Sequence, residues 1–304
     1  MSRFQINILG CGSATPTARH NPSCQVIDFR DRLFMVDCGE GAQVQMRKMK
    51  MKFSRLGHIF ISHMHGDHCF GLPGLLSTLS LHEKTGELTV HMPQEGVDVF
   101  SRIIEFFCRE STYDIKISPL DPKGGVIFED HAITVESFPL YHRVPCMGFI
   151  FREKPKLRHL RGDMVKYFNI PVSQLHGIKE GNDFVKPDGT VIENARITTD
   201  ADKAVSYAYC SDTLFDERVA EAVKGVDTIY HEATYDDDML EQARQRGHST
   251  ARQAGAIARL AGARQLVIGH YSKRYITPDI LVKQASEEFA NVIAANEGLK
   301  IDLL

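Results

Sequence analysis

The sequence predicts an α/β fold, and three observations support this prediction. Short apolar segments with strand composition alternate with longer segments of helical periodicity along most of the 304 residues. Candidate metal ligands recur directly after several of these strands, where α/β sheets present their functional groups. Hydrophobic residues make up 43% of the chain, which is enough for a substantial core.

The first half of the chain is predicted to begin with strands and to continue with alternating helices and strands. Segments 4–9, 25–29 and 32–36 have strand composition, and Arg30-Asp31 is the expected hairpin turn between the last two. A small antiparallel meander therefore opens the fold. The elements expected after it are helix 43–51, strand 58–61, helix 72–82, strand 88–91, helix 97–108 and strand 133–138.

Residues 152–192 interrupt this alternation. The segment contains Gly and Pro and has neither helical nor strand periodicity, so we interpret it as an arm inserted into a single domain of residues 1–304. The basic stretch at its start is a candidate for contacts with a phosphate backbone, although a solvated surface explains such a stretch equally well. A second basic run at residues 47–55 has the same two explanations. The basic residues at the start of the arm are Arg152, Lys154, Lys156, Arg158, Arg161 and Lys166.

Regular alternation resumes after the arm. Its best-marked helix begins at Thr250, which fits a capping box with Gln253, and ends before Gly262. A final helix is expected after Pro278, with an apolar face that extends from Leu281 to Ile293. The other elements expected here are strand 204–209, helix 216–223, strand 228–231 and strand 265–268.

Composition and charge narrow the functional class. The net charge of −3 does not by itself indicate a nucleic-acid partner. No apolar run approaches the length of a membrane span, and the first residues lack the layout of a signal peptide, so we expect a cytoplasmic protein without membrane association. Seven cysteines without a C-x-x-C pair favour reduced thiols over a disulfide framework.

The most informative motif is His63-Met64-His65-Gly66-Asp67-His68, which follows the apolar run of a predicted strand. It places four potential metal ligands within six positions. A strand that leads into a tight turn lets alternate side chains converge. We therefore expect His63 and His65 on one ion, and Asp67 and His68 on a second. Imidazole and carboxylate ligands suit zinc, with manganese and iron as alternatives.

Three further candidate ligands follow later strands. His142, Asp212 and His270 each lie just after a predicted strand, at the edge where α/β sheets present ligands. Two ions about 3.5 to 4 Å apart can hold a hydroxide between them and stabilise both the attacking and the leaving oxygen. A consistent assignment gives His63, His65 and His142 to one ion, Asp67, His68 and His270 to the other, and Asp212 to both.

Together these residues resemble the metallo-β-lactamase superfamily of binuclear hydrolases. Flanking motifs make the chain similar to the short form of the ribonuclease Z family, the tRNA 3′-processing endonucleases, because they occur in the expected order along nearly the whole chain. The string Gly10-Cys11-Gly12-Ser13 lacks the third glycine of a dinucleotide fingerprint, so we interpret it as a tight loop that supports the metal site. The flanking motifs are Leu9-Gly10-Cys11-Gly12-Ser13-Ala14-Thr15-Pro16, Asp37-Cys38-Gly39-Glu40-Gly41, Gly71-Leu72-Pro73-Gly74-Leu75-Leu76, His142-Arg143-Val144, His231-Glu232-Ala233-Thr234, Gly247-His248-Ser249-Thr250 and Gly269-His270-Tyr271-Ser272.

The resemblance implies a four-layer αββα sandwich with its site at the sheet edges and two zinc ions per subunit. The implied reaction is removal of the 3′ trailer from precursor tRNA by a metal-bridging hydroxide, which leaves a tRNA 3′-hydroxyl and a trailer 5′-phosphate. It also implies a homodimer in which the arm of one subunit serves the site of the other. In the family the arm is a flexible basic exosite for tRNA, usually with a Gly-Pro pair that residues 171–177 lack here.

Three residues are candidates for proton transfer. His248, a non-ligand imidazole just before a helix, is placed to protonate the departing 3′ oxygen or to hold the scissile phosphate. Glu232 either orients this imidazole or makes an ordinary structural hydrogen bond. Asp67 is expected to accept the proton of the attacking water in addition to binding metal.

Other functions on the same residues stay open. A phosphodiesterase for small or cyclic nucleotides is the nearest alternative, because a metal site cannot measure the size of its substrate. A β-lactam or thioester hydrolase is disfavoured, because the basic stretches would have no function in such an enzyme. An RNA-binding module without catalysis would not need the complete ligand set or His248.

Overall fold

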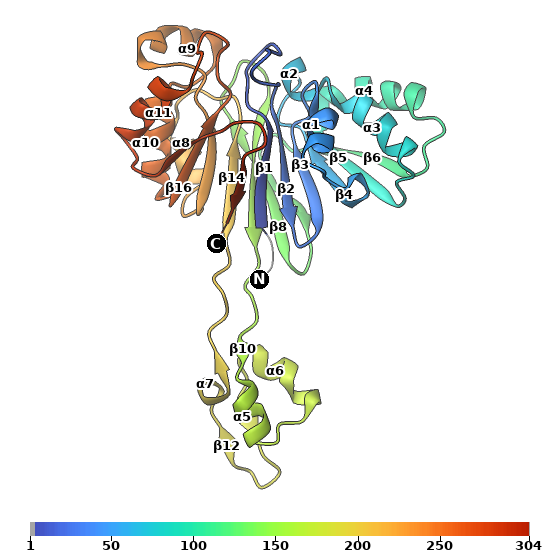
Figure 1. Ribbon diagram of the computed structural model, residues 1–304, viewed down its shortest axis with the longest axis vertical. Helices are drawn as coiled ribbons and strands as arrows, with labels where there is room; N and C mark the ends of the chain where they lie inside the picture. The colour runs from blue at the N-terminus through green and yellow to red at the C-terminus, as the bar shows by residue number, and fades with distance from the viewer. Residues whose placement is uncertain (1–3, 304) are drawn as a thin grey trace.

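The computed structural model describes residues 4–303, which form a body of two large sheets and a projecting arm (Figure 1). Each large sheet has seven strands. The first sheet consists, in spatial order, of β18 (Lys300–Asp302), β1 (Phe4–Gly10), β2 (Cys24–Phe29), β3 (Arg32–Val36), β4 (Leu56–Phe60), β5 (Glu87–Pro93) and β6 (Asp114–Leu120). The second consists of β17 (Val292–Ala294), β16 (Gln265–Gly269), β15 (Thr228–Glu232), β14 (Ser206–Cys210), β9 (Cys146–Glu153), β8 (Ile133–Leu140) and β7 (Gly125–Glu129).

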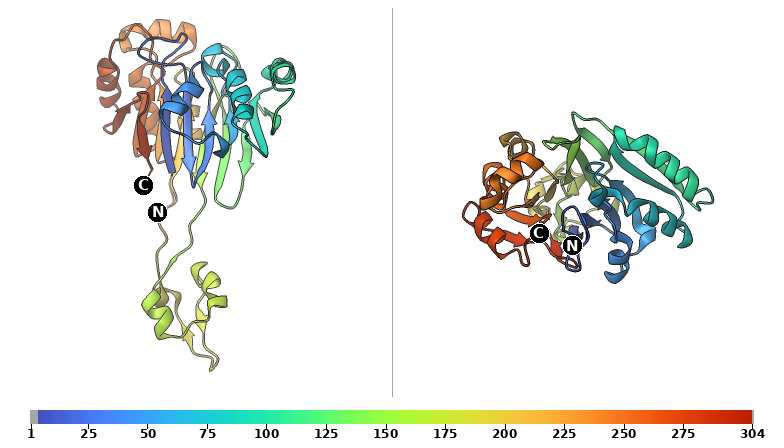
Figure 2. Two further views of the ribbon diagram at one scale, coloured as in Figure 1. Left: turned by 45° about the vertical axis from the view of Figure 1, so that its right-hand side comes forward. Right: turned by 90° about the horizontal axis from the view of Figure 1, so that it is seen from above.

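Helices cover the outer faces of both sheets, so the body has four layers in the order αββα (Figure 2). This confirms the predicted fold class. The helices of the first half are α1 (Ala42–Lys48), α2 (Gly66–Cys69), α3 (Leu72–Leu81) and α4 (Gln94–Phe107), with a 3-10 turn η1 (Phe53–Arg55). Those of the second half are α8 (Glu217–Ala222), α9 (Leu240–Arg246), α10 (Ala251–Ala261) and α11 (Asp279–Ser286), with a 3-10 turn η3 (Asp237–Met239). No helix within residues 4–303 combines the length and the apolar character that a membrane crossing requires.

The predicted meander is present at the start of the first sheet. β1, β2 and β3 pair antiparallel, and Arg30 and Asp31 adopt the left-handed conformation of a tight hairpin turn. β3 to β6 then pair in parallel, as expected for strands that alternate with helices. The core between the sheets is rich in aromatic side chains, among them Phe60, Phe151 and Tyr207, all fully buried.

The final helix is shorter than predicted. α11 ends at Ser286, and β17 pairs in parallel with β16 where the prediction extended the helix. The apolar residues near 292 fitted helical spacing. Val292 and Ile293 are β-branched, however, and pair with the edge of the second sheet, so tertiary pairing decided the conformation.

The arm lies between β9 and β14, and its limits differ from the predicted range of 152–192. Arg152 belongs to β9, where it pairs with Thr134 and Ser206. The returning limb continues past residue 192, because β13 (Thr198–Thr199) pairs with β10 (His159–Leu160). The prediction followed charge and Gly/Pro content, which do not mark where a strand leaves a sheet.

The arm has regular structure and a small core of its own. Its remaining elements are α5 (Gly162–Tyr167), η2 (Val172–Gln174), α6 (Leu175–Lys179), β11 (Phe184–Val185), β12 (Val191–Ile192) and α7 (Asn194–Ile197). Ile178, Phe184 and Ile197 are buried in this core. The core is too small to be visible as a long apolar period in the sequence, which explains why the segment resembled a loop.

Candidate metal centre

All seven predicted ligands meet at one edge of the two sheets. His63 and His65 follow β4, and Asp67 and His68 lie on the short helix α2. His142, Asp212 and His270 follow β8, β14 and β16 of the other sheet. Each sheet thus contributes predicted ligands from the ends of its strands, and the packing of the two sheets brings these two sets of ligands face to face.

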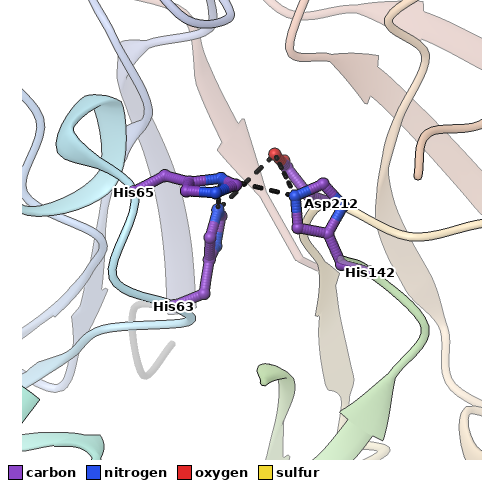
Figure 3. Close-up of side chains that lie close together, drawn as sticks. All are labelled: His63, His65, His142 and Asp212. Carbon is purple, nitrogen blue, oxygen red and sulfur yellow. Dashed lines mark hydrogen bonds and ion pairs between the residues drawn. The ribbon is translucent and has the colours of Figure 1, made fainter. Parts of the chain in front are cut away.

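The first group contains His63, His65, His142 and Asp212, whose ligand atoms point toward one another (Figure 3). His63 Nε2 lies 3.0 Å from His65 Nδ1, and His142 Nε2 lies 3.3 Å from the same atom. Asp212 Oδ2 is 3.6 Å from His63 Nε2 and 3.9 Å from His142 Nε2. Zinc bonds of about 2.0 to 2.2 Å require ligand separations of roughly 3.3 to 3.6 Å in a tetrahedron, so this spacing fits one ion.

The second group contains Asp67, His68 and His270. Asp67 Oδ2 lies 3.6 Å from His68 Nε2 and 3.5 Å from His270 Nε2. Asp212 Oδ1 is 3.5 Å from His68 Nε2 and 3.2 Å from His270 Nε2. Asp212 therefore turns one carboxylate oxygen toward each group, the geometry of a bridging ligand.

Three buried atoms of this centre lack a hydrogen bond. His68 Nε2, His270 Nε2 and Asp212 Oδ1 have no hydrogen-bond partner within the described part of the chain. Buried polar atoms are normally paired, because an unpaired one costs roughly 1–3 kcal/mol. Burial also lowers the pKa of His63 and His142, which favours the neutral imidazole that a metal ligand requires, whereas at His68 the carboxylates of Asp212 and Asp37 outweigh burial and raise the pKa. The donor set is that of a divalent metal site.

Asp37 holds His68 from behind, and no role was predicted for it. Its Oδ2 lies 2.7 Å from His68 Nδ1 and accepts a hydrogen bond of 2.8 Å from the Tyr209 hydroxyl. The Ser62 backbone N–H donates to its other oxygen at 2.8 Å. A carboxylate behind a ligand imidazole fixes the ring so that Nε2 faces the metal. The available sequence signal was an aspartate directly after β3, the same position that identified the other ligands.

Two other predicted ligand imidazoles are oriented in the same way. His142 Nδ1 lies 2.7 Å from the Gly247 carbonyl oxygen, and His270 Nδ1 lies 2.9 Å from the Thr234 hydroxyl. Both contacts leave Nε2 free for the metal. Asp67 is fixed from the side by the backbone N–H of Ala14, which donates to its Oδ2 at 2.7 Å.

His248 stands beside the centre, next to a buried carboxylate. Its Nδ1 is 3.0 Å from Glu232 Oε1 and 3.9 Å from Asp212 Oδ2. Burial opposes protonation of His248, but the carboxylates of Glu232 and Asp212 outweigh it and raise the pKa of the imidazole. Burial likewise opposes ionisation of Glu232, and His248 outweighs it and lowers the pKa of the carboxyl. Both pKa shifts favour the imidazolium–carboxylate form of this pair.

Glu232 has a structural role as well as a contact with His248. Its carboxylate accepts backbone N–H bonds from Thr213 at 3.0 Å, Thr234 at 3.1 Å and Ser249 at 3.0 Å. One buried side chain thus joins the loops after β14 and β15 to the start of α10. Glu232 thus makes contacts of both kinds that the sequence left open, one with the His248 imidazole and others with neighbouring backbone.

The centre opens into a cavity of about 650 Å³. It is lined by His65, Asp67, Asp212, His248 and His270 together with three basic residues for which no role was predicted. One of these lies within a quoted motif and the other two directly adjoin one, which was the available signal. They are Arg143, Arg246 and Lys273.

Most of the predicted RNA-binding residues form ion pairs within the chain. Lys166 is exposed and has no acidic partner within 4 Å among residues 4–303. The pairs made by Arg152, Lys154, Arg158 and Arg161 are partly exposed and worth little, so they leave these side chains available to phosphates, whereas Lys156 pairs with the buried Glu153. The pairs are Arg152–Glu136 at 3.5 Å, Lys154–Glu129 at 2.6 Å, Lys156–Glu153 at 3.1 Å, Arg158–Asp200 at 2.8 Å and Arg161–Asp163 at 3.5 Å.

Known proteins resemble this chain along its whole length. It is 49% identical over 304 residues to "Ribonuclease Z" of Bacteroides fragilis strain YCH46, and 48% identical over 304 residues to "Ribonuclease Z" of Parabacteroides distasonis, with 100% of both chains covered in each case. The crystal structure of human tRNase Z, short form, superposes with a TM-score of 0.70 at 25% identity and covers 98% of each chain. The metallo-β-lactamase fold protein YhfI of Bacillus subtilis, at 18% identity and a TM-score of 0.70, shares the fold and covers 99% of this chain and 100% of its own. A family model described as "Anti-Pycsar protein Apyc1" matches residues 4–100, less than half of the chain.

Proposed function

This chain belongs to the ribonuclease Z family, and from that premise we propose that it is a zinc-dependent endoribonuclease that removes the 3′ trailer from precursor tRNA. The observation that carries the proposal is Asp212, whose two carboxylate oxygens face two separate ligand groups beside His248. Two zinc ions in these groups would lower the pKa of a water and neutralise phosphate charge. Manganese and iron are alternatives for the same ligands.

The surrounding residues support hydrolysis of a phosphodiester. His248, held by Glu232, faces the cavity, and its imidazolium form can donate a proton to the departing 3′ oxygen. Asp67 Oδ2 belongs to the second ligand group and is placed to accept a proton from the attacking water. Cleavage with these roles leaves a tRNA 3′-hydroxyl and a trailer 5′-phosphate.

Charge at the cavity rim supports a nucleic-acid substrate. Arg143, Arg246 and Lys273 line the cavity mouth, and Arg246 Nη1 donates to the Tyr235 hydroxyl at 3.2 Å, which orients it. Guanidinium and ammonium groups bind the phosphates that flank a scissile bond. These residues extend the proposed tRNA contacts beyond the six basic residues near the arm.

The position of the arm supports the proposed exosite and a homodimer. The arm leaves the body at the amino end of β14, whereas Asp212 follows the carboxyl end of the same strand (Figure 1). The arm therefore points away from the metal centre of its own chain. A dimer in which each arm serves the partner's site brings exosite and centre onto one substrate. We propose that the body is a single domain carrying this arm, and that the cytoplasm, a reducing compartment, suits its seven free thiols.

The deciding experiment is cleavage of an end-labelled precursor tRNA beside a small activated phosphodiester, with chelator and with added zinc. Chelator-sensitive release of one intact trailer is the expected result. Hydrolysis of the small ester alone would instead favour the small-nucleotide phosphodiesterase, and metal-free RNA binding without cleavage would favour an inactive binding module.

The substitution Asp212→Ala tests the proposed metal centre. We expect this variant to lose both metals and all cleavage, because one side chain serves both ligand groups. Elemental analysis of the purified variant measures the metal content. Retention of two metals per chain by Asp212→Ala would contradict the bridging assignment.

A further inference from the structure

A second group of ligand-type side chains lies apart from the seven proposed ligands. Cys11 directly follows β1, His20 lies in the loop before β2, and Glu297 lies between β17 and β18. Cys11 and Glu297 are separated by 286 positions in the sequence. The three side chains nevertheless converge, and all three are of types that bind metal ions.

The distances among the three ligand atoms suit one tetrahedral ion. Cys11 Sγ lies 3.4 Å from His20 Nδ1 and 3.8 Å from Glu297 Oε1, and His20 Nδ1 lies 2.9 Å from Glu297 Oε2. Zinc bonds of about 2.3 Å to sulfur and about 2.0 to 2.2 Å to nitrogen and oxygen require separations of roughly 3.3 to 3.7 Å. The three distances bracket this range, so small side-chain rotations are sufficient.

Burial and charge also suit a metal ion. Cys11 is fully buried, whereas the side chains of His20 and Glu297 are 16% and 13% exposed, which leaves an open side for a water ligand. Within the described residues, His20 is the only basic group within 4 Å of Glu297. The Asn21 backbone N–H donates to Glu297 Oε1 at 2.8 Å and fixes the carboxylate. Thiolate, imidazole and carboxylate together favour zinc among the common divalent ions.

We propose that Cys11, His20 and Glu297 form a third metal site, which takes zinc or another thiophilic divalent cation. Binding releases the thiol proton of Cys11 to solvent, and the thiolate, the neutral imidazole and the carboxylate then complete three of four positions around the ion. A water fills the fourth. This site does not depend on the proposed nuclease function.

The third site is connected to the proposed catalytic centre through the backbone. The Tyr271 N–H donates to the Cys11 carbonyl at 2.9 Å, and the Ser13 N–H donates to the Tyr271 carbonyl at 3.1 Å. Tyr271 adjoins the ligand His270, and Ala14 of the same loop holds Asp67. An ion on Cys11 therefore stabilises the loop that supports two ligands of the other centre.

Cobalt(II) distinguishes the third site from the other centre, because none of the seven proposed ligands supplies sulfur. Metal-free protein is titrated with Co²⁺, and the sulfur-to-cobalt charge-transfer absorption in the near ultraviolet is recorded. We expect a band whose final amplitude corresponds to one cobalt–thiolate site per chain, reached within the three equivalents that the three sites take up, and that is lost in Cys11→Ser. His20→Gln should weaken the binding about tenfold or more, since it removes one of three protein ligands.

Two other cysteines provide matched controls. Cys108→Ser alters a thiol far along the sequence, and Cys146→Ser alters the thiol 3.6 Å from His63 Nδ1; both should keep the band. Far-ultraviolet circular dichroism measures whether each variant is folded. If Cys11→Ser does not fold, the weaker cobalt binding expected of His20→Gln tests the third site instead. Absence of the band in the unmodified chain, or its survival in folded Cys11→Ser, would overturn the third site. Neither result bears on tRNA cleavage, which has its own assay.

Discussion

At the scale of single residues, a position just after a strand predicts most of the proposed metal ligands. His142, Asp212 and His270 were selectable because each follows a strand, and the sheet edges bring them together. Asp37 follows a strand too, but its role depends on a contact with His68 across the fold. No role was predicted for Arg143 and Arg246 although they lie within or beside a quoted motif, because only the folded chain places both side chains along one cavity.

His248→Ala should separate catalysis from metal binding. The imidazole contacts Glu232 and faces the cavity but belongs to neither ligand group of the proposed assignment. We expect metal content to stay unchanged while kcat falls by about 10²- to 10⁴-fold, the usual contribution of a general acid. His82→Ala, at an exposed histidine, is the control and should keep full activity. A metal-free His248→Ala protein would refute this division of roles.

At the scale of elements, capping motifs predicted the two ends of α10 correctly, whereas apolar spacing overestimated the length of the final helix. The capping box of Thr250 and Gln253 is confirmed, with Gly262 in the left-handed conformation at the other end of α10. The helix predicted to reach residue 293 is wrong beyond Ser286, because strand pairing at the sheet edge overrides helical spacing. Capping signals are local, whereas the choice between helix and edge strand depends on a neighbour distant in sequence.

Thr250→Ala should destabilise the protein through α10. The Thr250 hydroxyl accepts the Gln253 backbone N–H, which otherwise has no helical partner. We expect the free energy of unfolding to fall by about 1 kcal/mol. Urea denaturation followed by circular dichroism measures the change. Thr250→Ser keeps the cap and should show a much smaller loss; equal losses in both variants would exclude capping as the cause.

At the scale of the whole molecule, the family resemblance correctly predicted the four-layer sandwich. Composition located the arm but did not predict its internal structure. Its charge and its Gly/Pro content located an insertion, but the small core around Phe184 and the pairing of β10 with β13 form only in three dimensions. The arm and the metal centre lie at opposite ends of β14. The proposed substrate contacts of the arm should therefore be separable by mutation from chemistry at the proposed metal centre.

Removal of the arm should affect large substrates only. Replacing residues 156–202 with a short Gly-Ser turn keeps β9 and β14 intact, because the backbone pairing of Glu153 with Val205 closes the base. We expect KM for precursor tRNA to rise by about tenfold or more, since several phosphate contacts are lost. Hydrolysis of a small phosphodiester should be unchanged. Unaltered tRNA kinetics would refute the exosite.

The buried pair of His58 and His91 should make the body sensitive to acid. Burial among aromatic rings lowers the pKa of His58 to about 4 and that of His91 to about 3. Both values lie below the ordinary pKa of histidine, so the unfolded chain binds more protons once the pH falls below about 6.5. The free energy of unfolding should therefore decrease from about pH 6.5 downward.

Urea unfolding at about pH 7.5 and about pH 5 tests this dependence. The variant with both histidines replaced by leucine should lose less stability between the two conditions than the unmodified chain does. The metal ligands are the same in both proteins, so their titration cancels in the comparison. An identical acid response in the two proteins would contradict the assignment.

The pairing of β18 with β1 has a consequence for biosynthesis. Gln5 Nε2 donates to Asp302 Oδ1 at 2.7 Å, a contact that spans 297 positions. While a ribosome is still translating the chain, β1 has emerged early but its outer edge has no partner until residues 300–302 follow. An open strand edge is a template for pairing with other chains. The outer edge of β1 is therefore open to misassociation until residues 300–302 have been translated, and pairing with β18 then closes it.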